Sequence, residues 1–292
     1  MVGKVSKALN KVESTLKPDY TSPAPFHGLK GTPGTSAENK KENRESKVAP
    51  LSPPTGGSIE NWDERLVYAI ENFSGVAESF RKLRTMILHP ESGNPARSIM
   101  VMSSDPQEGK SFICANLGVS FAHSIEQKAL MIDCDLRRPS LQGLFGLKCK
   151  KGLANYLRDG DNISDLIIST GLPKLTIIPA GSPPDNPSEL LSSDKMSDMI
   201  NELTNRYDDR LLLLDTPPFH AASETLVLSQ LVDKVVLVVR WGKSGRENVK
   251  KMIDSIGREK IIGVVFNAFE MNIIDRKVQG VGYHNYYSES YY

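Results

Sequence analysis

The 292-residue sequence predicts an α/β fold in which a mostly parallel sheet is flanked by helices. From about residue 62, apolar runs of strand length alternate with helical segments. The predicted strands are apolar along their whole length, as expected when both faces of a sheet are covered. Two of these runs end in acidic residues, and another leads into a loop that ends in Gly-Lys-Ser. We therefore expect a ligand site at the carboxyl edge of the sheet.

The predicted elements follow one another in a βαβα series. The predicted strands are 98–103, 129–133, 175–179, 211–215, 234–240 and 261–267. The predicted helices are 76–87, 110–123, 194–207, 223–232 and 246–256. In the first helix, Val76, Phe80, Leu83 and Ile87 form an apolar face, and the helix is expected to end before Pro90. A series of this kind makes a parallel sheet wrapped by helices.

Composition divides the chain into four parts. Apolar residues recur at helical spacing near its start, at Val2, Val5, Leu9, Val12 and Leu16. Residues 1–16 are therefore predicted to form a short amphipathic helix, and both a docking role and a weakly structured start remain open. Residues 17–60 are rich in Pro, Gly, Ser, Lys and Glu and are predicted to be a disordered linker. Residues 61–271 form the predicted domain, and residues 272–292 a flexible, tyrosine-rich tail.

Charge and cysteine usage limit the function classes. A formal net charge of +1 gives no general attraction to nucleic acid or to an anionic membrane. Cys114, Cys134 and Cys149 show no CxxC spacing and are interpreted as reduced thiols rather than a metal site or disulfide framework. No apolar run of about 18 residues and no signal peptide is present, so a cytoplasmic protein is expected. Membrane association would then require a partner or a surface helix.

The segment 103–111 has the context of a phosphate-binding loop, because a predicted strand precedes it and a predicted helix follows. Gly109 allows close approach of the backbone to phosphate, Lys110 can reach the β- and γ-phosphates, and the Ser111 hydroxyl can bind Mg²⁺. The predicted nucleotide-binding residues are Ser104, Gln107, Glu108, Gly109, Lys110, Ser111 and Phe112. Ser104 occupies a position where the general motif has Gly, and an ordinary helix start is the alternative. The fold is therefore predicted to be of the P-loop NTPase type.

Three acidic residues end the predicted strands 129–133 and 211–215. Asp133, Asp135 and Asp215 are expected to converge on Lys110 and Ser111, because ligands bind at the carboxyl ends of strands in open α/β sheets. Ser111, Asp133 and Asp215 are the predicted Mg²⁺ ligands, since Mg²⁺ prefers hard oxygen ligands and keeps several waters. A single strand-end Asp is more often a helix cap, but three beside a phosphate loop favour a ligand site.

These motifs resemble those of the bacterial tyrosine kinases of capsule and exopolysaccharide synthesis, over roughly residues 70–292. The family's S-x-x-P-G-E-G-K-[ST] motif is matched with Gln107 in place of the usual Gly. Its D-x-D-x-R motif corresponds to Asp133, Asp135 and Arg137, and its D-x-x-P motif begins at Asp215. The D-x-D-x-R element is the most specific of these, because general P-loop ATPases do not carry it in this form.

Other segments extend the resemblance. Glu78, Arg81 and Arg84 match the family's E-x-x-R-x-x-R oligomerisation motif and are expected to face outward on their helix. Residues 186–191 match an N-P-x-E-L-L segment, whereas Glu224 stands where the family has Asp. The start of the chain is similar to kinases of this family that are encoded apart from their membrane partner. The tail carries the expected phosphate acceptors Tyr283, Tyr286, Tyr287, Tyr291 and Tyr292.

The resemblance implies a non-specific protein-tyrosine kinase that uses ATP and Mg²⁺ and phosphorylates its own tail in trans. Lys110 would neutralise charge on the transferred phosphate, and Asp135 would orient or deprotonate the tyrosine, a role that Asp133 can share. Arg137 and Arg138 would position phosphate or an acidic tail. Asn267 would contact the adenine edge, or is a simple turn residue.

The same resemblance implies partners. Subunits would form a homo-oligomeric ring whose dissociation follows tail phosphorylation, because each phosphate adds nearly two negative charges. A transmembrane polysaccharide co-polymerase or adaptor would recruit the kinase to the inner face of the membrane and activate it. A cognate tyrosine phosphatase would reverse the reaction, and no nucleic-acid partner is expected.

Two other functions remain open at this stage. A partitioning-type ATPase switch of the same fold carries a second Lys near the start of the loop, where this chain has Asp105. A non-catalytic nucleotide-binding scaffold for polysaccharide assembly would not need the complete set of Lys110, Ser111 and three aspartates.

Overall fold

The computed structural model describes residues 56–66, 75–90, 93–206 and 209–268. The predicted helix 1–16, most of the predicted linker 17–60 and the whole predicted tail 272–292 lie outside these residues. The described residues all belong to one compact unit of the chain, 50–292.

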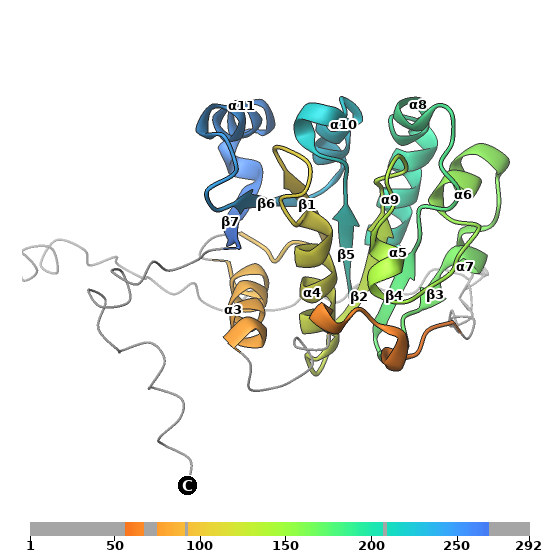
Figure 1. Cartoon of the computed structure of the whole chain (residues 1–292). Helices are drawn as coiled ribbons and strands as arrows, with labels where there is room; N and C mark the ends of the chain where they lie inside the picture. Colours follow the sequence, from red (N-terminus) through yellow and green to blue (C-terminus); the bar gives the residue numbers. More distant parts are fainter. Residues whose placement is uncertain (1–55, 67–74, 91–92, 207–208, 269–292) are drawn as a thin grey trace, which may run out of the picture. The chain divides into compact units, whose positions relative to one another are not determined.

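The centre of the molecule is a seven-stranded sheet with the order β3-β4-β2-β5-β1-β6-β7 (Figure 1). The strands are β1 Ser98–Ser103, β2 Lys128–Asp133, β3 Ile168–Ser169, β4 Leu175–Ile178, β5 Arg210–Asp215, β6 Lys234–Arg240 and β7 Ile261–Asn267. Every neighbouring pair is parallel except β3 and β4, which are antiparallel. The predicted mostly parallel sheet is therefore confirmed, and the six predicted strands are all present.

Helices flank both faces of this sheet. The helices are α3 Gly75–Leu88, α4 Lys110–Ala122, α5 Leu141–Leu144, α6 Leu153–Asp159, α7 Ile163–Leu166, α8 Pro187–Leu191, α9 Asp194–Arg206, α10 Glu224–Leu231 and α11 Arg246–Ile256, with short 3-10 turns Ile59–Asn61, Phe219–Ala221 and Arg258–Lys260. All five predicted helices are present. The short elements α5 to α8 and β3 were not predicted, because segments of two to seven residues are too short to display a clear helical or strand period.

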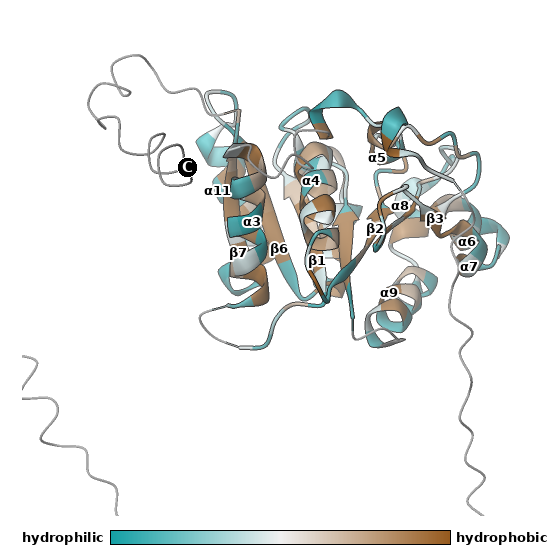
Figure 2. Cartoon of the chain, turned by 90° about the horizontal axis from the view of Figure 1, so that it is seen from below, coloured by the Kyte–Doolittle hydropathy of each residue, from teal (hydrophilic) through white to brown (hydrophobic). Residues whose placement is uncertain are grey.

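Alternate residues of the central strands supply two separate cores. One core lies on the α3 and α4 side, where Ile99, Val101 and Met131 pack. The other lies on the α9, α10 and α11 side, where Met100 and Leu130 pack. Figure 2 shows hydrophobic residues running along β1, β2 and β6 between the helices. Burial on both faces explains why the sequence of each strand is apolar throughout.

The apolar face of α3 differs from the prediction by a rotation of the helix. Ala77, Phe80 and Ile87 are buried, whereas Val76 is 44% exposed. The prediction that Val76 belongs to the core is therefore wrong. Ala77 takes its place because the helix turns the side that also carries Arg84 toward α4.

The segment that leads into the domain is anchored along the β3–β4 turn. The indole nitrogen of Trp62 donates a hydrogen bond to the Thr170 carbonyl at 2.8 Å, and its ring contacts Phe145 edge-on. A Cβ atom on Gly57 would lie 2.4 Å from the Thr170 backbone, so only glycine permits this approach. These contacts hold residues 57–62 against the turn that follows β3.

Candidate functional site

The phosphate-binding loop connects β1 to α4, as predicted. Gly109 caps the helix in the left-handed region, with φ 96° and ψ 19°. A Cβ atom there would lie 2.0 Å from Nδ2 of Asn267, so the position requires glycine for both conformation and space. The loop thus delivers the unpaired N–H groups and positive dipole end of the 13-residue helix α4 to one point.

Lys110 lies among the strand-end carboxylates. Its Nζ is 3.1 Å from Oδ2 of Asp135, 3.8 Å from Oδ1 of Asp215 and 3.3 Å from Oγ of Ser111. Burial by itself would lower the pKa of Lys110, but the charges of Asp215, Asp135 and Asp133 outweigh it and raise the pKa. The lysine is therefore a permanent cation at the place where phosphate oxygens would bind.

Asp133 and Asp215 stand side by side at the ends of the neighbouring strands β2 and β5. Both are fully buried. Asp133 accepts hydrogen bonds from the backbone N–H groups of Asp135 and Leu141, at 3.2 and 3.1 Å. Burial and the charge of Asp215 raise the pKa of Asp133 well above its usual value. Burial also raises the pKa of Asp215, against the opposing charge of Lys110.

The donor set at this point fits a small hard cation. Both carboxylate oxygens of Asp215 are buried and, among the described residues, lack a hydrogen-bond partner of normal geometry. Oγ of Ser111 accepts a 2.8 Å hydrogen bond from Ser140, a neighbour that the sequence analysis did not identify. Within the described ranges no group of three or more His, Cys, Asp or Glu residues could hold a metal ion. Two carboxylates and a hydroxyl nevertheless suit Mg²⁺, which keeps several of its waters.

Several predicted nucleotide-binding side chains face the protein instead. Glu108 is 1% exposed and accepts hydrogen bonds from Oγ of Ser104, the backbone N–H of Asp105 and Oγ of Ser244. Asn267 donates from Nδ2 to the Glu108 carbonyl at 2.8 Å and accepts at Oδ1 from the Ala268 N–H. Ser104, Glu108 and Asn267 therefore shape the loop in this structure.

The side chain of Arg137 contacts two residues that lie outside the cluster around Lys110. Its Nε lies 3.2 Å from Oε1 of Glu224, and its Nη2 donates to Oγ of Ser188 at 2.8 Å. Ser188 in turn donates to Oε2 of Glu224 at 2.9 Å. Glu224 is 1% exposed, so Arg137 compensates a buried charge and joins the end of β2 to α8 and α10. The backbone N–H of Arg138 donates to Oδ1 of Asp135 at 3.1 Å, which orients that carboxylate.

The predicted oligomerisation residues lie on α3. Glu78 and Arg81 form a partly exposed ion pair at 2.7 Å. Arg84, in contrast, donates from Nη1 to the Ser120 carbonyl of α4, and burial and the charge of Arg81 lower its pKa. The expectation that all three residues face outward is therefore wrong for Arg84.

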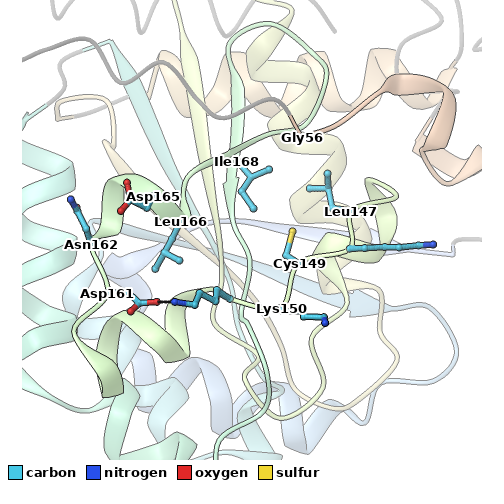
Figure 3. A pocket seen from close by; sticks show the side chains of 11 residues that line it. Gly56, Leu147, Cys149, Lys150, Asp161, Asn162, Asp165, Leu166 and Ile168 are labelled. Atoms are coloured by element: carbon cyan, nitrogen blue, oxygen red, sulfur yellow. Dashed lines mark hydrogen bonds and ion pairs between the residues drawn. The ribbon is translucent and has the colours of Figure 1, made fainter.

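A cavity lies apart from this site. It has a volume of about 440 Å³ and is lined by residues of 147–151 and 161–168 together with Gly56 (Figure 3). Figure 3 shows the half-buried Cys149 beside Lys150, and an ion pair from Asp161 to Lys151 measures 2.8 Å. None of its lining residues belongs to the phosphate loop or to the three strand-end aspartates.

The fold and the loop together define a class of nucleotide-binding protein. The family model of the CobQ/CobB/MinD/ParA nucleotide binding domain matches residues 99–281. This range contains the phosphate loop and all the aspartates described above, so the geometric site coincides with the nucleotide-binding domain of this class.

Similar proteins identify the family within this class. CapB of Staphylococcus aureus is 32% identical over 218 residues, which make up 74% of this chain and 92% of CapB. The tyrosine-protein kinase YwqD of Bacillus subtilis is 32% identical over 67% of this chain and 82% of its own length. The kinase domain of the Escherichia coli tyrosine kinase ETK is 29% identical, with a TM-score of 0.64 over 73% of this chain and 84% of that domain. The chain belongs to the bacterial tyrosine-protein kinase family.

The predicted phosphate acceptors and the predicted lack of a membrane-spanning segment concern regions beyond the site. The five tail tyrosines lie outside the described residues. Among the helices that the structure describes, none is long and apolar enough to cross a membrane.

Proposed function

We propose that this chain transfers the γ-phosphate of ATP to tyrosines of its own C-terminal tail, in trans between subunits. The observation that carries the proposal is the convergence of Lys110, Asp135 and Asp215 at the N-terminus of α4. A cation and helix N–H groups suit the phosphates, and a carboxylate nearby suits an incoming hydroxyl. A simple nucleotide switch would need the cation and the helix N–H groups to bind phosphates. It would not need a carboxylate such as Asp135 to accept a proton from a hydroxyl group.

The phosphates of ATP would bind along the backbone N–H groups of residues 107–111. Ser111, Asp133 and Asp215 would hold Mg²⁺, which would supply charge neutralisation between the β- and γ-phosphates. The buried oxygens of Asp215, which lack a hydrogen-bond partner of normal geometry among the described residues, support this assignment. Lys110 would exchange its 3.1 Å contact with Asp135 for a γ-phosphate oxygen, because phosphate offers it a stronger charge.

That exchange would release Asp135 for the acceptor tyrosine. The phenol oxygen would form a bond to the γ-phosphorus as the bond to the β,γ-bridging oxygen breaks, and ADP would leave. The phenol proton would pass to Asp135, whose other oxygen is held by the Arg138 N–H. Lys110 would stabilise the charge that develops on the transferred group. Arg137 would act by holding the 134–139 segment through Glu224 and Ser188 rather than by touching phosphate.

The acceptors would be Tyr283, Tyr286, Tyr287, Tyr291 and Tyr292. Glu78 and Arg81 would contribute directly to a ring of subunits, and Arg84 would contribute by fixing α3 against α4. Phosphorylation would favour dissociation of the ring through charge repulsion. We further propose that a membrane-embedded polysaccharide co-polymerase recruits and activates the kinase in the cytoplasm, that a phosphatase resets it, and that the cycle regulates capsule or exopolysaccharide synthesis and export.

The test maps phosphotyrosine by mass spectrometry on protein purified from its own cells. Lys110→Met should abolish tail phosphorylation while the circular dichroism spectrum and melting temperature remain those of a folded domain. Lys250→Met, which removes an exposed lysine of α11, is the matched control and should phosphorylate normally. Unchanged tail labelling in Lys110→Met would overturn the proposal. ATP hydrolysis without tail phosphorylation would favour the partitioning-type switch, and nucleotide binding without either would favour the scaffold.

A further inference from the structure

The phosphate loop contains a residue in an unfavourable backbone conformation. Gln107 has a φ of 63°, although it is not glycine. For such a residue the left-handed region costs about 1–2 kcal/mol, because its Cβ approaches the following carbonyl oxygen. Strain of this kind persists only where the surroundings hold it in place. Gln107 is exposed, so packing of its own side chain does not provide that restraint.

The restraint comes from the end of β6 and the turn that follows. Nη1 of Arg240 donates a 2.9 Å hydrogen bond to the Gln107 carbonyl, across 133 residues of sequence. Nζ of Lys243 lies 3.4 Å from Oε1 of the same residue. The main chain and the side chain of Gln107 are therefore both held by cations from one turn.

The same turn and the first turn of helix α11 also hold the flanking residues of the loop. Oγ of Ser244 donates to the buried carboxylate of Glu108, and Nδ2 of Asn248 lies 3.2 Å from Oδ2 of Asp105. The turn is itself fixed, because the Arg240 N–H donates to Oγ of Ser244 at 2.8 Å. We call Arg240, Lys243, Ser244 and Asn248 the loop clamp.

The conformation that the clamp maintains is useful to the site. Gln107 and Gly109 are both left-handed, at φ 63° and 96°. Residues that alternate between right- and left-handed conformations direct successive N–H groups into one concavity, which binds anions. The Arg240 hydrogen bond commits the Gln107 carbonyl to the clamp. Were this peptide to relax, its carbonyl dipole would be free to turn toward the phosphates and repel them.

We propose that Arg240 is a positioning residue for nucleotide binding, which acts by holding Gln107 in its strained conformation. The inference rests on the proposed function, since it assumes that the loop receives nucleotide phosphates. It predicts that substitutions at positions 240 and 107 have non-additive effects on nucleotide binding. Glycine adopts a φ of 63° without strain, so Gln107→Gly should make the clamp dispensable. A direct Arg240–phosphate contact would not be rescued in this way.

The first measurement is the dissociation constant of Mg·ADP by isothermal titration calorimetry with the full chain. Arg240→Ala should weaken binding about five- to thirtyfold, which corresponds to the release of the strain that Arg240 now holds. The double variant Arg240→Ala/Gln107→Gly should return to within about threefold of Gln107→Gly alone. Arg258→Ala, which removes an exposed arginine before β7, is the matched control and should bind as wild type does. Wild-type affinity in Arg240→Ala, or no rescue in the double variant, would overturn the inference.

The second measurement needs no nucleotide, so it separates this inference from the proposed function. When Gln107→Gly is introduced into the wild-type protein, the urea concentration at the unfolding midpoint should rise, because the substitution removes strain. It should raise the midpoint of Arg240→Ala by less, because Gln107 will have relaxed there already. Equal shifts in both backgrounds would refute the strain mechanism even if Mg·ADP binds. Failure of Mg·ADP to bind wild type, together with unequal shifts, would instead count against the proposed function.

Discussion

Replacing Asp215 by Asn should make the nucleotide-free protein more stable and should remove most of the stabilisation that nucleotide gives. Asp215 is fully buried, and its two carboxylate oxygens lack a hydrogen-bond partner of normal geometry among the described residues, although the nearby Ser111 hydroxyl and Thr216 N–H act to lower its pKa. Its nearest cation, Lys110, is 3.8 Å away and is already bound to Asp135 at 3.1 Å. The substitution removes a buried charge and leaves Lys110 in its hydrogen-bonded ion pair with Asp135.

The magnitude follows from the cost of a buried polar group without a partner, about 1–3 kcal/mol. Because the Asn amide is itself polar, we expect about 1–2 kcal/mol of added stability. A domain of this size gains about 2–4 °C in melting temperature per kcal/mol, so the increase should be about 2–8 °C. In the wild type, Mg·ADP at a hundred times its dissociation constant should stabilise by about 2.7 kcal/mol, and the variant should lose most of that shift.

The pH dependence of this difference has a defined sign. Burial raises the pKa of Asp215 in the folded state, against the opposing charge of Lys110. A carboxyl group with a raised folded pKa stabilises the fold below its unfolded pKa, and that contribution is lost as pH rises through the folded pKa. The stability advantage of Asp215→Asn should therefore widen as pH rises from about 4 through the raised pKa of Asp215.

The assay is differential scanning calorimetry with and without Mg·ADP at several pH values. Asp209→Asn is a matched control, because Asp209 precedes the same strand but forms a partly exposed ion pair with Lys128 at 2.6 Å. The control should change stability by at most about 1 kcal/mol and should keep the nucleotide shift. A less stable Asp215→Asn that responds normally to Mg·ADP would refute the reasoning.

Two further predictions concern residues outside the phosphate loop. Cys114 and Cys134 are buried, so a thiol reagent should modify only the half-buried Cys149 in the native protein. Burial raises the pKa of Cys149, so its labelling should be slower than that of a free thiol and should accelerate as pH rises. A second rapidly labelled thiol would contradict this prediction. Arg137→Met should lower unfolding free energy in urea by about 1–3 kcal/mol, because the buried Glu224 loses its cation, and adding Glu224→Gln should recover part of the loss. Additive destabilisation in the double variant would show that the two residues do not act as a pair.

The chemical centre of the site could be predicted from the sequence because its residues lie at strand ends. Two of them, Asp133 and Asp215, are the last residues of apolar strands, and Asp135 lies two residues beyond the first of these strands. Lys110 is the first residue of the helix that follows β1. In a parallel sheet all such ends meet at one edge, so topology converts sequence position into spatial proximity. No side-chain detail was needed to bring these four residues together.

The roles of neighbouring residues could not be predicted in the same way. Glu108 stands within the nucleotide-binding motif but turns inward to Ser104 and Ser244. Asn267 was interpreted either as an adenine contact or as a turn residue, and in the structure both ends of its amide are used by Glu108 and Ala268. These outcomes depend on rotamers and on contacts between segments more than a hundred residues apart, which no local pattern records.

Helix α3 illustrates the same limit. Its amphipathic period correctly predicted a helix, but the period does not determine rotation within about one residue. Arg84 donates to the Ser120 carbonyl of α4, so Ala77 is buried and Val76 is not. The choice between these rotations depends on the surface of the partner helix.

By itself the sequence determined the α/β class, the parallel strands, the phosphate loop and the acidic strand ends, because each follows from a repeat period or a short spacing. Only the tertiary structure decided that Arg137 serves Glu224 and that Arg240 holds Gln107. The physical reason is that these hydrogen bonds join the loops after β2 and β1 to distant residues of α10 and β6, and the packing of the whole sheet selects such partners. The family's usual glycine at position 107 is replaced here by a residue that the distant turn must restrain.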